Sequence, residues 1–348
     1  MEAHTLAIVW FVLIAVLWTG YLVLEGFDFG VGMLLAPFSR DETERRLVIN
    51  TIGPVWDGNE VWLLVAGGAM FAAFPEWYAT MFSGFYLPLL LILVALIVRA
   101  VAFEWRGKID DVLWRRRWDR AITFGSWAPA VLWGVAFGNL VRGVEMDADH
   151  QMTSSLLDLL NPYALVGGAT TSLLFLTHGA VFLSLKTDGE FRHRVRALAA
   201  RLAMVSAVVG VVFVVWTQVA FSDKAWTWAA VALAAVGALG ALQAIRAGRE
   251  GWAFAASAVT ILAAVVLIYG AMFPNVMPAI NDPANSLTVA NAAATPKTLT
   301  ILTWVAAFLT PLVLAYQGWT YWVFRKRLTA DRIPAAIGLS RRRDPAAH

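Results

Sequence analysis

Long apolar runs separated by short polar connections dominate this chain. A run of about 20 apolar residues is long enough to cross the ~30 Å hydrocarbon core of a bilayer as a helix. Runs of this kind lie at 6–35, 51–73, 78–103, 119–141, 160–185, 198–220, 225–245, 251–273 and 298–324. The pattern predicts an all-α polytopic membrane protein with nine transmembrane helices in one membrane domain, 1–348.

The nine predicted helices suggest a simple grouping. Residues 6–141 would form a first four-helix bundle and residues 160–273 a second one, with the ninth helix at 298–324 packed alongside. The segment before the first apolar run carries no Lys or Arg, so this run is interpreted as a retained span and not a signal peptide. Residues 325–348 would form a basic cytoplasmic tail.

Basic residues alternate between the two sides of the predicted bundle. They are concentrated in the connections at 36–50, 104–118, 186–197 and 246–250 and in the tail. The other connections offer only Arg142, Lys224 and Lys297. Because basic connections stay in the cytoplasm, we expect the N-terminus outside and the C-terminus inside. Runs such as Arg115–Arg117 are then topology signals and anionic-lipid contacts, and nucleic acid is not an expected partner.

Composition narrows the chemistry. The 348 residues are 59% hydrophobic and 15% charged, with no cysteine. The lack of cysteine excludes disulfides, thiolate nucleophiles and Cys-ligated iron–sulfur clusters. Of five histidines only His178 lies in a predicted span, so convergent histidine ligands for haem are not available. We predict that His178 is a hydrogen-bonded packing residue and that the chain binds no metal.

Six charged residues lie inside the first four spans, all toward the predicted cytoplasmic side. They are Glu25, Asp28, Asp57, Glu60, Arg99 and Asp119. The first four form two pairs spaced i, i+3, so each pair shares a helical face. At ~1.5 Å rise per residue, all six fall within about 10–15 Å of one another in depth. We therefore expect them to converge on one site.

The expected site has two compatible interpretations. Ionisable groups inside a membrane are costly and usually have a partner or a function. One arginine cannot neutralise five carboxylates, so some of them should share protons, as in a proton-holding cluster open to the cytoplasm. The alternative is a structural ion-pair network that holds four helices in register. Asp57 alone also suits a helix N-terminus, where the helix dipole favours an anion.

Gly26 and Gly30 stand four residues apart in the first span. The surrounding sequence lacks the preceding strand and following lysine of a phosphate-binding loop. Small residues four apart in an apolar helix instead favour close helix packing.

Several blocks of the sequence together resemble subunit II of the cytochrome bd quinol oxidases. The blocks are Gly26–Met33, Thr43–Arg46, Trp56–Trp62, Gly67–Ala69, Phe82–Tyr86, Gly134–Leu140, Leu160–Pro162, Ala271–Pro278 and Leu299–Val305. They occur in the family's order and cover nearly the whole chain, and the Trp-Asp-Gly-Asn block is highly specific. The chain departs from the pattern at Glu60, where relatives carry Gln, and in a very short connection at 221–225.

The resemblance implies a terminal oxidase of the bacterial inner membrane, which oxidises quinol and reduces dioxygen to water. In that family two b-type haems and one d-type haem sit on the larger subunit I, the obligate partner of subunit II. Small single-helix subunits and membrane lipids are further partners. Asp28, Asp57, Arg99 and Asp119 match the family's polar positions, and Asp57 is the favoured proton-path residue. The isolated chain is expected to be inactive.

The alternative from the residues themselves is a proton-coupled secondary transporter that uses the acidic cluster. Transporters commonly have helices broken near the midplane and inverted repeats. No repeat is evident here, and the charges lie toward one face of the membrane. The sequence therefore favours the oxidase subunit.

Overall fold

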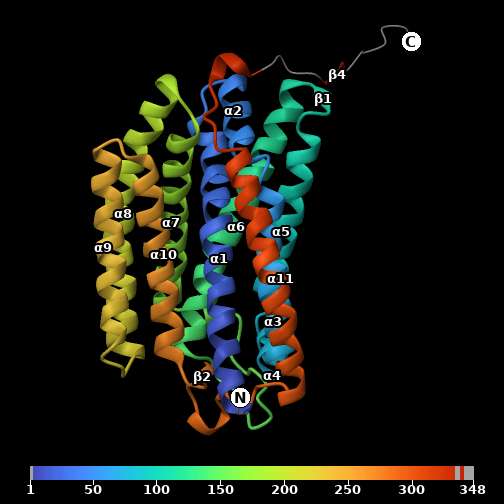
Figure 1. Ribbon diagram of the computed structural model, residues 1–348, viewed down its shortest axis with the longest axis vertical. Helices are drawn as coiled ribbons and strands as arrows, with labels where there is room; N and C mark the ends of the chain where they lie inside the picture. Colours follow the sequence, from blue (N-terminus) through green and yellow to red (C-terminus); the bar gives the residue numbers. More distant parts are fainter. Residues whose placement is uncertain (1–2, 334–337, 341–348) are drawn as a thin grey trace.

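Most of the described residues of this chain lie in long helices that run side by side (Figure 1). The computed structural model describes residues 3–333 and 338–340. The long helices are α1 (Ala3–Phe38), α3 (Trp56–Ala73), α5 (Tyr86–Trp105), α6 (Val112–Arg142), α7 (Pro162–Lys186), α8 (Gly189–Phe221), α9 (Thr227–Arg246), α10 (Glu250–Met272) and α11 (Pro296–Val323). The shorter elements are α2 (Glu42–Ile52), α4 (Pro75–Gly84), β1 (Ile109–Asp110), β2 (Asn275–Met277), β3 (Leu287–Thr288), β4 (Leu339–Ser340) and three single-turn 3-10 helices.

The prediction of an all-helical polytopic membrane protein is confirmed. Among the described residues, eight helices are long and apolar enough to cross a membrane. The predicted span at 51–73 corresponds to α3, which is not one of the eight because Asp57, Asn59 and Glu60 make its first turn polar. The count of nine membrane helices, the sidedness and the two-bundle grouping remain predictions.

Two predicted spans contain breaks that the apolar pattern did not indicate. The run at 51–73 begins in a separate short helix, α2, and α3 ends at Ala73 because the residue before Pro75 is disfavoured in helical conformation. The run at 78–103 is divided at Phe85 into α4 and α5. Pro88 lacks the N–H that would bond to the Gly84 carbonyl, so the helix does not continue unbroken across this point.

Helix α1 occupies the middle of the structure and contacts α3, α6, α7, α10 and α11 (Figure 1). Its contact with α7 is very close. A Cβ atom added to Gly30 would collide with the carbonyl oxygen of Phe175 and lie 2.8 Å from the Cα of Gly179. A Cβ atom added to Gly26 would lie 2.7 Å from the Phe175 ring. The predicted packing role of the two glycines is thus confirmed.

Helix α11 lies on the outside and packs mainly against α3 and α1. Leu299 is its one buried residue, whereas large side chains such as Trp304, Phe308 and Trp319 are exposed. Near the start of α11, the Trp10 indole of α1 donates to the Thr303 hydroxyl at 3.0 Å. Most of the α11 surface is therefore unpartnered within this chain.

The chain after α11 crosses the basic end of the bundle, which is the end where α1 finishes and α6 begins. The Leu328 N–H donates to the Lys186 carbonyl at 2.7 Å, and the Asp188 N–H donates to the Leu328 carbonyl at 3.1 Å. Arg327 donates to the Thr187 carbonyl at 2.7 Å. This part of the predicted tail is thus a structural strap on the α7–α8 turn. Residues 334–337 and 341–348, including Arg341–Arg343, lie outside the described residues.

We predict that Gly30→Ala destabilises the protein by roughly 1–3 kcal/mol, because the added methyl group forces α1 and α7 apart. Thermal unfolding of the purified protein in mild detergent measures the change. Gly210→Ala in α8 is the matched control, since an added Cβ there meets nothing within 4 Å. Equal stability of both variants and the unaltered protein would show that the α1–α7 contact is not tight.

Candidate functional site

Five polar residues from three helices meet inside the structure and form what we call the charge cluster. They are Glu25 and Asp28 of α1, Asn59 and Glu60 of α3, and Arg99 of α5. All but Glu60 have no exposed surface, and Glu60 is half-buried. The long apolar helices thus enclose two carboxylates and a guanidinium group completely.

Arg99 and Glu25 form the central ion pair of the cluster. The Arg99 Nη1 donates to Glu25 Oε1, and neither side chain has any exposed surface. The guanidinium carbon also lies 4.8 Å from the ring centroid of Phe29 and 5.4 Å from that of Phe103, within cation–π distance. Arg99 is therefore held by one carboxylate and two aromatic rings from α1 and α5.

The protein does not use all the hydrogen-bonding capacity of these buried groups. Glu25 Oε2, Asp28 Oδ1, Glu60 Oε2 and two of the Arg99 nitrogens have no hydrogen-bond partner among the described residues. Buried polar atoms normally bond to protein or to ordered water. The cluster therefore presents several free acceptors and donors in one small volume.

Asn59 links the cluster to α11. Its Nδ2 donates to Asp28 Oδ2 at 2.7 Å, while its Oδ1 accepts from Tyr321 Oη at 2.8 Å and from Gln317 Nε2 at 3.1 Å. The Trp62 indole donates to Gln317 Oε1 at 2.8 Å. A chain of hydrogen bonds thus runs from a fully buried carboxylate to the outermost helix. Neither Gln317 nor Tyr321 was singled out from the sequence.

Asp57 does not join the buried part of the cluster. Its side chain is exposed in the first turn of α3, where Oδ1 accepts from the Gly58 N–H at 2.8 Å. Glu60 lies one turn further along α3, within electrostatic range of both Asp57 and Arg99. The expected i, i+3 pair therefore leads from the surface of α3 toward the buried ion pair.

Asp119 belongs to a second cluster at the basic end. Its Oδ1 accepts from Arg106 Nε at 2.5 Å, and its Oδ2 lies 3.6 Å from Arg45 Nε. Arg106 also donates to both carboxylate oxygens of Glu42 at 2.9 Å. The expectation that all six residues converge on one site is thus wrong.

Asp119 is separate from the charge cluster because of arginines in the basic connections. In the sequence, Arg99 lies inside the predicted span at 78–103, whereas Arg45 and Arg106 lie in basic connections that indicate topology. Both arginines instead fold against Asp119, which lies about two turns into α6 and nearer to them than to Arg99. The spacing contained a signal for this, because Arg99 and Arg106 are seven residues apart and share one helical face.

His178 is engaged by hydrogen bonds on both sides of its ring, as predicted. Nε2 lies 3.2 Å from the Val23 carbonyl and Nδ1 lies 2.7 Å from Ser257 Oγ. The ring also stacks on Phe254 with centroids 4.4 Å apart. His178 therefore ties α7 to α1 and α10. Among the described residues no group of three or more His, Cys, Asp or Glu side chains is suited to hold a metal ion.

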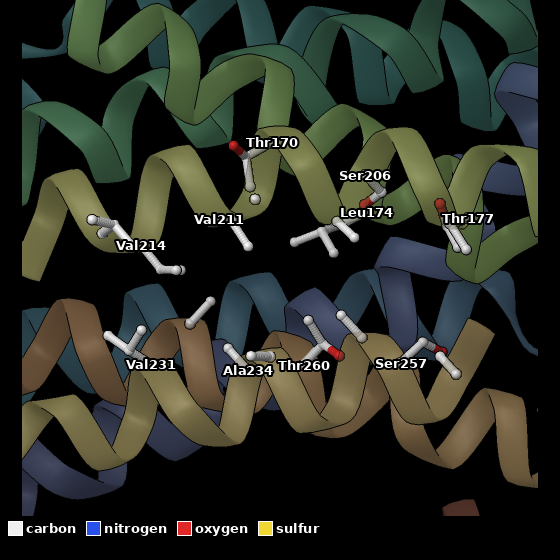
Figure 2. A pocket seen from close by; sticks show the side chains of 18 residues that line it. Thr170, Leu174, Thr177, Ser206, Val211, Val214, Val231, Ala234, Ser257 and Thr260 are labelled. Atoms are coloured by element: carbon white, nitrogen blue, oxygen red, sulfur yellow. The ribbon is translucent and has the colours of Figure 1, made fainter. Parts of the chain in front are cut away.

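A cavity of about 270 Å³ lies between α7, α8, α9 and α10, away from both clusters (Figure 2). It is lined by apolar and hydroxyl side chains only. The hydroxyls of Thr170, Thr177 and Thr260 each donate to a carbonyl of their own helix, so the cavity offers little unsatisfied polarity. The cavity therefore offers fewer free donors and acceptors than the charge cluster.

The fold and the site define a multi-pass helical membrane protein with an ion-pair centre enclosed by its helices. The sequence profile described as cytochrome bd terminal oxidase subunit II matches residues 6–324. The chain therefore belongs to this family, as the resemblance indicated, and is a protein of the bacterial inner membrane.

Individual relatives agree with the family assignment. The chain is 41% identical to cytochrome bd ubiquinol oxidase subunit 2 of Bacillus subtilis (strain 168), over 92% of this chain and 96% of the relative. It is 38% identical to cytochrome bd-I ubiquinol oxidase subunit 2 of Escherichia coli (strain K12), over 96% and 98%. A chain in the structure of bd oxidase from Geobacillus thermodenitrificans superposes with a TM-score of 0.74 at 17% identity, covering 92% of this chain and 98% of that one. That likeness shows a shared fold.

We predict that Arg99→Met destabilises the protein by roughly 3–5 kcal/mol, because Glu25 is left buried without its counter-charge. The double variant Arg99→Met/Glu25→Gln should recover much of this loss, since no unpaired charge remains. Thermal unfolding and the yield of folded protein report both effects. Arg116→Met, which removes an exposed arginine of α6, serves as the control. A double variant no more stable than Arg99→Met would argue against the ion pair as the main contribution.

Proposed function

We propose that this chain supports a haem-bearing subunit I in a quinol:oxygen oxidoreductase and supplies part of its proton path from the cytoplasm. The observation that supports this proposal is the family match over residues 6–324, combined with carboxylates that lead from an exposed position to a buried ion pair. Oxidation of quinol and reduction of dioxygen to water would occur on the partner, and this chain would deliver protons toward the oxygen-reducing site.

The proposed path begins at Asp57. Its exposed carboxylate can exchange protons with water, and Glu60 stands one helical turn away with its Oε2 buried and unbonded. Glu60 would pass the proton to the free oxygens of Glu25 and Asp28. Proton transfer requires donors and acceptors within hydrogen-bond reach, directly or through a water. The unsatisfied buried oxygens are the groups that such waters would contact.

Arg99 would keep the path functional without carrying the proton. Its guanidinium remains charged in proteins and stabilises one negative charge among the carboxylates. A second carboxylate in the same volume then shares or holds a proton, as expected for coupled sites. The second cluster around Asp119 would serve a structural role, because its charges are paired.

Among the described residues, His178 is engaged in a way that does not suit haem ligation. Haem iron needs an axial ligand with a free donor atom, and both ring nitrogens of His178 are engaged by Val23 and Ser257. We therefore place the two b-type haems and the d-type haem of the complex on subunit I. Bound there, they supply the electron-transfer and oxygen chemistry that this chain lacks.

The outward face of α3, α5 and α11 is the proposed contact with subunit I. It is apolar and aromatic, with exposed Trp304, Trp319 and Trp322 on α11, and membrane interfaces depend mainly on such packing. Asp57 is exposed on α3, one of the helices of this face. A partner there would cover the apolar surface and receive protons close to Asp57. Small single-helix subunits and lipids would cover the remaining surface.

A proton-coupled transporter remains the competing hypothesis from the acidic cluster alone, and the family assignment does not favour it. The two hypotheses differ in a simple observation. An absorption spectrum of the protein purified in mild detergent from its native membrane should show the haems of a co-purifying partner. A spectrum without haem, with the chain intact and abundant, would favour the transporter.

We predict that Asp57→Asn assembles with normal haem content but loses oxygen-reduction rate and proton uptake. Asparagine keeps the volume and much of the hydrogen bonding of aspartate but cannot take up a proton. Oxygen consumption and proton uptake by the purified complex measure the effect, with haem content from the spectrum. The matched control is Asp223→Asn, which alters an exposed carboxylate paired with Lys224. If Asp57 is structural instead, haem content and stability should fall together with activity. Full turnover with normal haem would exclude Asp57 as an essential relay.

We also predict that the chain expressed alone binds no haem in stoichiometric amounts, because His178 has no free ring nitrogen. The measurement is a pyridine haemochrome assay on the purified isolated chain. Recovery of one haem per chain would contradict both the assignment of the haems to subunit I and the role of His178.

A further inference from the structure

We propose that Asn59 is a positioning residue that links the protonation state of Asp28 to the docking of α11. The proposal deepens the proposed proton path and rests on it for its relevance to turnover. It follows from the donor and acceptor roles of a single side-chain amide, whose two ends bond to different parts of the structure.

Hydrogen bonds from α11 determine which end of the Asn59 amide faces Asp28. Tyr321 Oη and Gln317 Nε2 both point at one amide atom, at 2.8 and 3.1 Å. The Gln317 NH₂ can only donate, so this atom must be the Asn59 oxygen. The orientation of Gln317 is fixed in turn, because the Trp62 indole can only donate and lies 2.8 Å from Gln317 Oε1. Docked α11 therefore fixes the Asn59 NH₂ toward Asp28.

The Asn59 NH₂ determines how Asp28 can hydrogen-bond in this arrangement. Asn59 Nδ2 lies 2.7 Å from Asp28 Oδ2, and a donated N–H requires a lone pair on that oxygen. A proton would bind first to Asp28 Oδ1, which has no hydrogen-bond partner among the described residues, so the Asn59 bond to Oδ2 would remain but would lose the strength that a charged acceptor gives it. If the amide turns, the proton can instead lie on Oδ2 and be donated to Asn59 Oδ1, so neutral Asp28 no longer requires the NH₂ orientation that docked α11 fixes.

A turned Asn59 amide would also change the hydrogen bonds to α11. Its NH₂ would then face Gln317 and Tyr321, and although the Tyr321 hydroxyl can turn and accept, the Gln317 NH₂ loses its acceptor. Gln317 can turn as well, but its oxygen then leaves the Trp62 indole without a partner. Each lost bond in an apolar region costs free energy. Uptake of a proton by Asp28 and release of α11 are therefore linked, and such linkage is reciprocal.

Other groups around Asp28 also act on its charge. Glu25 stands on the same helix, Glu60 on α3, Arg99 on α5 and the Tyr321 hydroxyl on α11. Arg99 is fully buried and bonded to Glu25, so it favours a charged cluster without fixing which carboxylate holds a proton. Asn59 is the hydrogen-bonding partner of Asp28 Oδ2 that also contacts α11. It is therefore the residue that connects the two events.

The consequence would reach beyond this chain. Helix α11 contacts its own bundle through few groups and exposes most of its surface, where subunit I is proposed to bind. A helix held by Asn59 on one side and by a partner on the other would transmit the charge state of Asp28 to that partner. The inference requires no new ligand and uses a proton that arrives from water through the path described above.

The test uses the resting complex, so that its outcome is independent of turnover. Infrared difference spectra recorded as a function of pH detect the carbonyl stretch of protonated Asp28, assigned by its loss in Asp28→Asn. In the double variant Tyr321→Phe/Gln317→Leu the Asn59 amide is free to turn. We expect the proton affinity of Asp28 to rise by about tenfold, within the range typical of coupled sites. Tyr316→Phe, which alters an exposed tyrosine of α11, should leave the band unchanged.

A second experiment measures the position of α11 relative to α10 directly. The chain has no cysteine, so Gly251→Cys and Gly318→Cys place two spin labels on α10 and α11 at positions where a side chain meets nothing within 4 Å. Pulsed electron paramagnetic resonance then gives the distance between them. Asp28→Asn, which can donate as protonated Asp28 does, should broaden or shift the distribution at every pH. The same change should appear in the otherwise unaltered chain at low pH only.

Several results would overturn the inference. An Asp28 band that does not move in the double variant, or an α11 distance unaffected by Asp28→Asn, would show that the two events are independent. If the double variant does not assemble, the single variant Gln317→Leu removes the donor that fixes the Asn59 amide and supplies the same comparison. Failure of the proton path is seen separately, as full turnover of Asp57→Asn with the Asp28 band still shifting in Gln317→Leu.

Discussion

A buried guanidinium group among carboxylates is the constraint on which the interior of this protein depends. Arg99 has no exposed surface and is bonded to Glu25, and moving such charges from water into a low-dielectric interior costs several kcal/mol for each ion even after relaxation. The cost is tolerable only if α1 and α5 hold the partners together and aromatic rings shield them. This requirement explains why Phe29 and Phe103 flank the guanidinium and why polar residues of α3 gather at the same depth.

The close approach of the other helices follows a different principle. The α1–α7 contact brings Gly30 against Gly179, and the α6–α7 contact brings Gly134 against Gly167, so backbones touch where side chains are absent. In a bilayer such contacts are strengthened by packing and not by the hydrophobic effect, because lipid is as apolar as the helices. The two principles act at different places on α1: its glycines fix its distance to α7, while its carboxylates face α3 and α5. One helix therefore aligns the packed core with the charge cluster.

The sequence predicted the helices well and the contacts between them only in part. Apolar length identifies a span because every backbone group in lipid must bond within its own segment. The breaks at 53–55 and at Phe85 were missed because single prolines, Pro54 and Pro88, act locally and leave the apolar pattern intact. The gathering of Glu25, Asp28, Glu60 and Arg99 was expected from their spacing, and Asp57 in the first turn of α3 fits the stated alternative of a helix N-terminus. The separate site of Asp119 was unforeseen, because spacing along a helix does not give lateral position. Arg106 and Asn59 were missed since a connection arginine and an amide show their partners only when distant helices are placed together.

The exposed position of Asp57 carries an argument about assembly. An ionised carboxylate on the outer face of a membrane helix is costly in contact with lipid, yet this one stands on α3 among exposed apolar residues such as Val61 and Leu64. An ion pair within this chain would remove the cost, but Arg99 is engaged with Glu25, and Arg106 with Asp119 and Glu42. Under the proposed function the polar surroundings of Asp57 would come from subunit I and from water at the contact. The residue proposed to take up protons would then be completed by the partner, so that a path to the oxygen-reducing site opens only in the assembled oxidase.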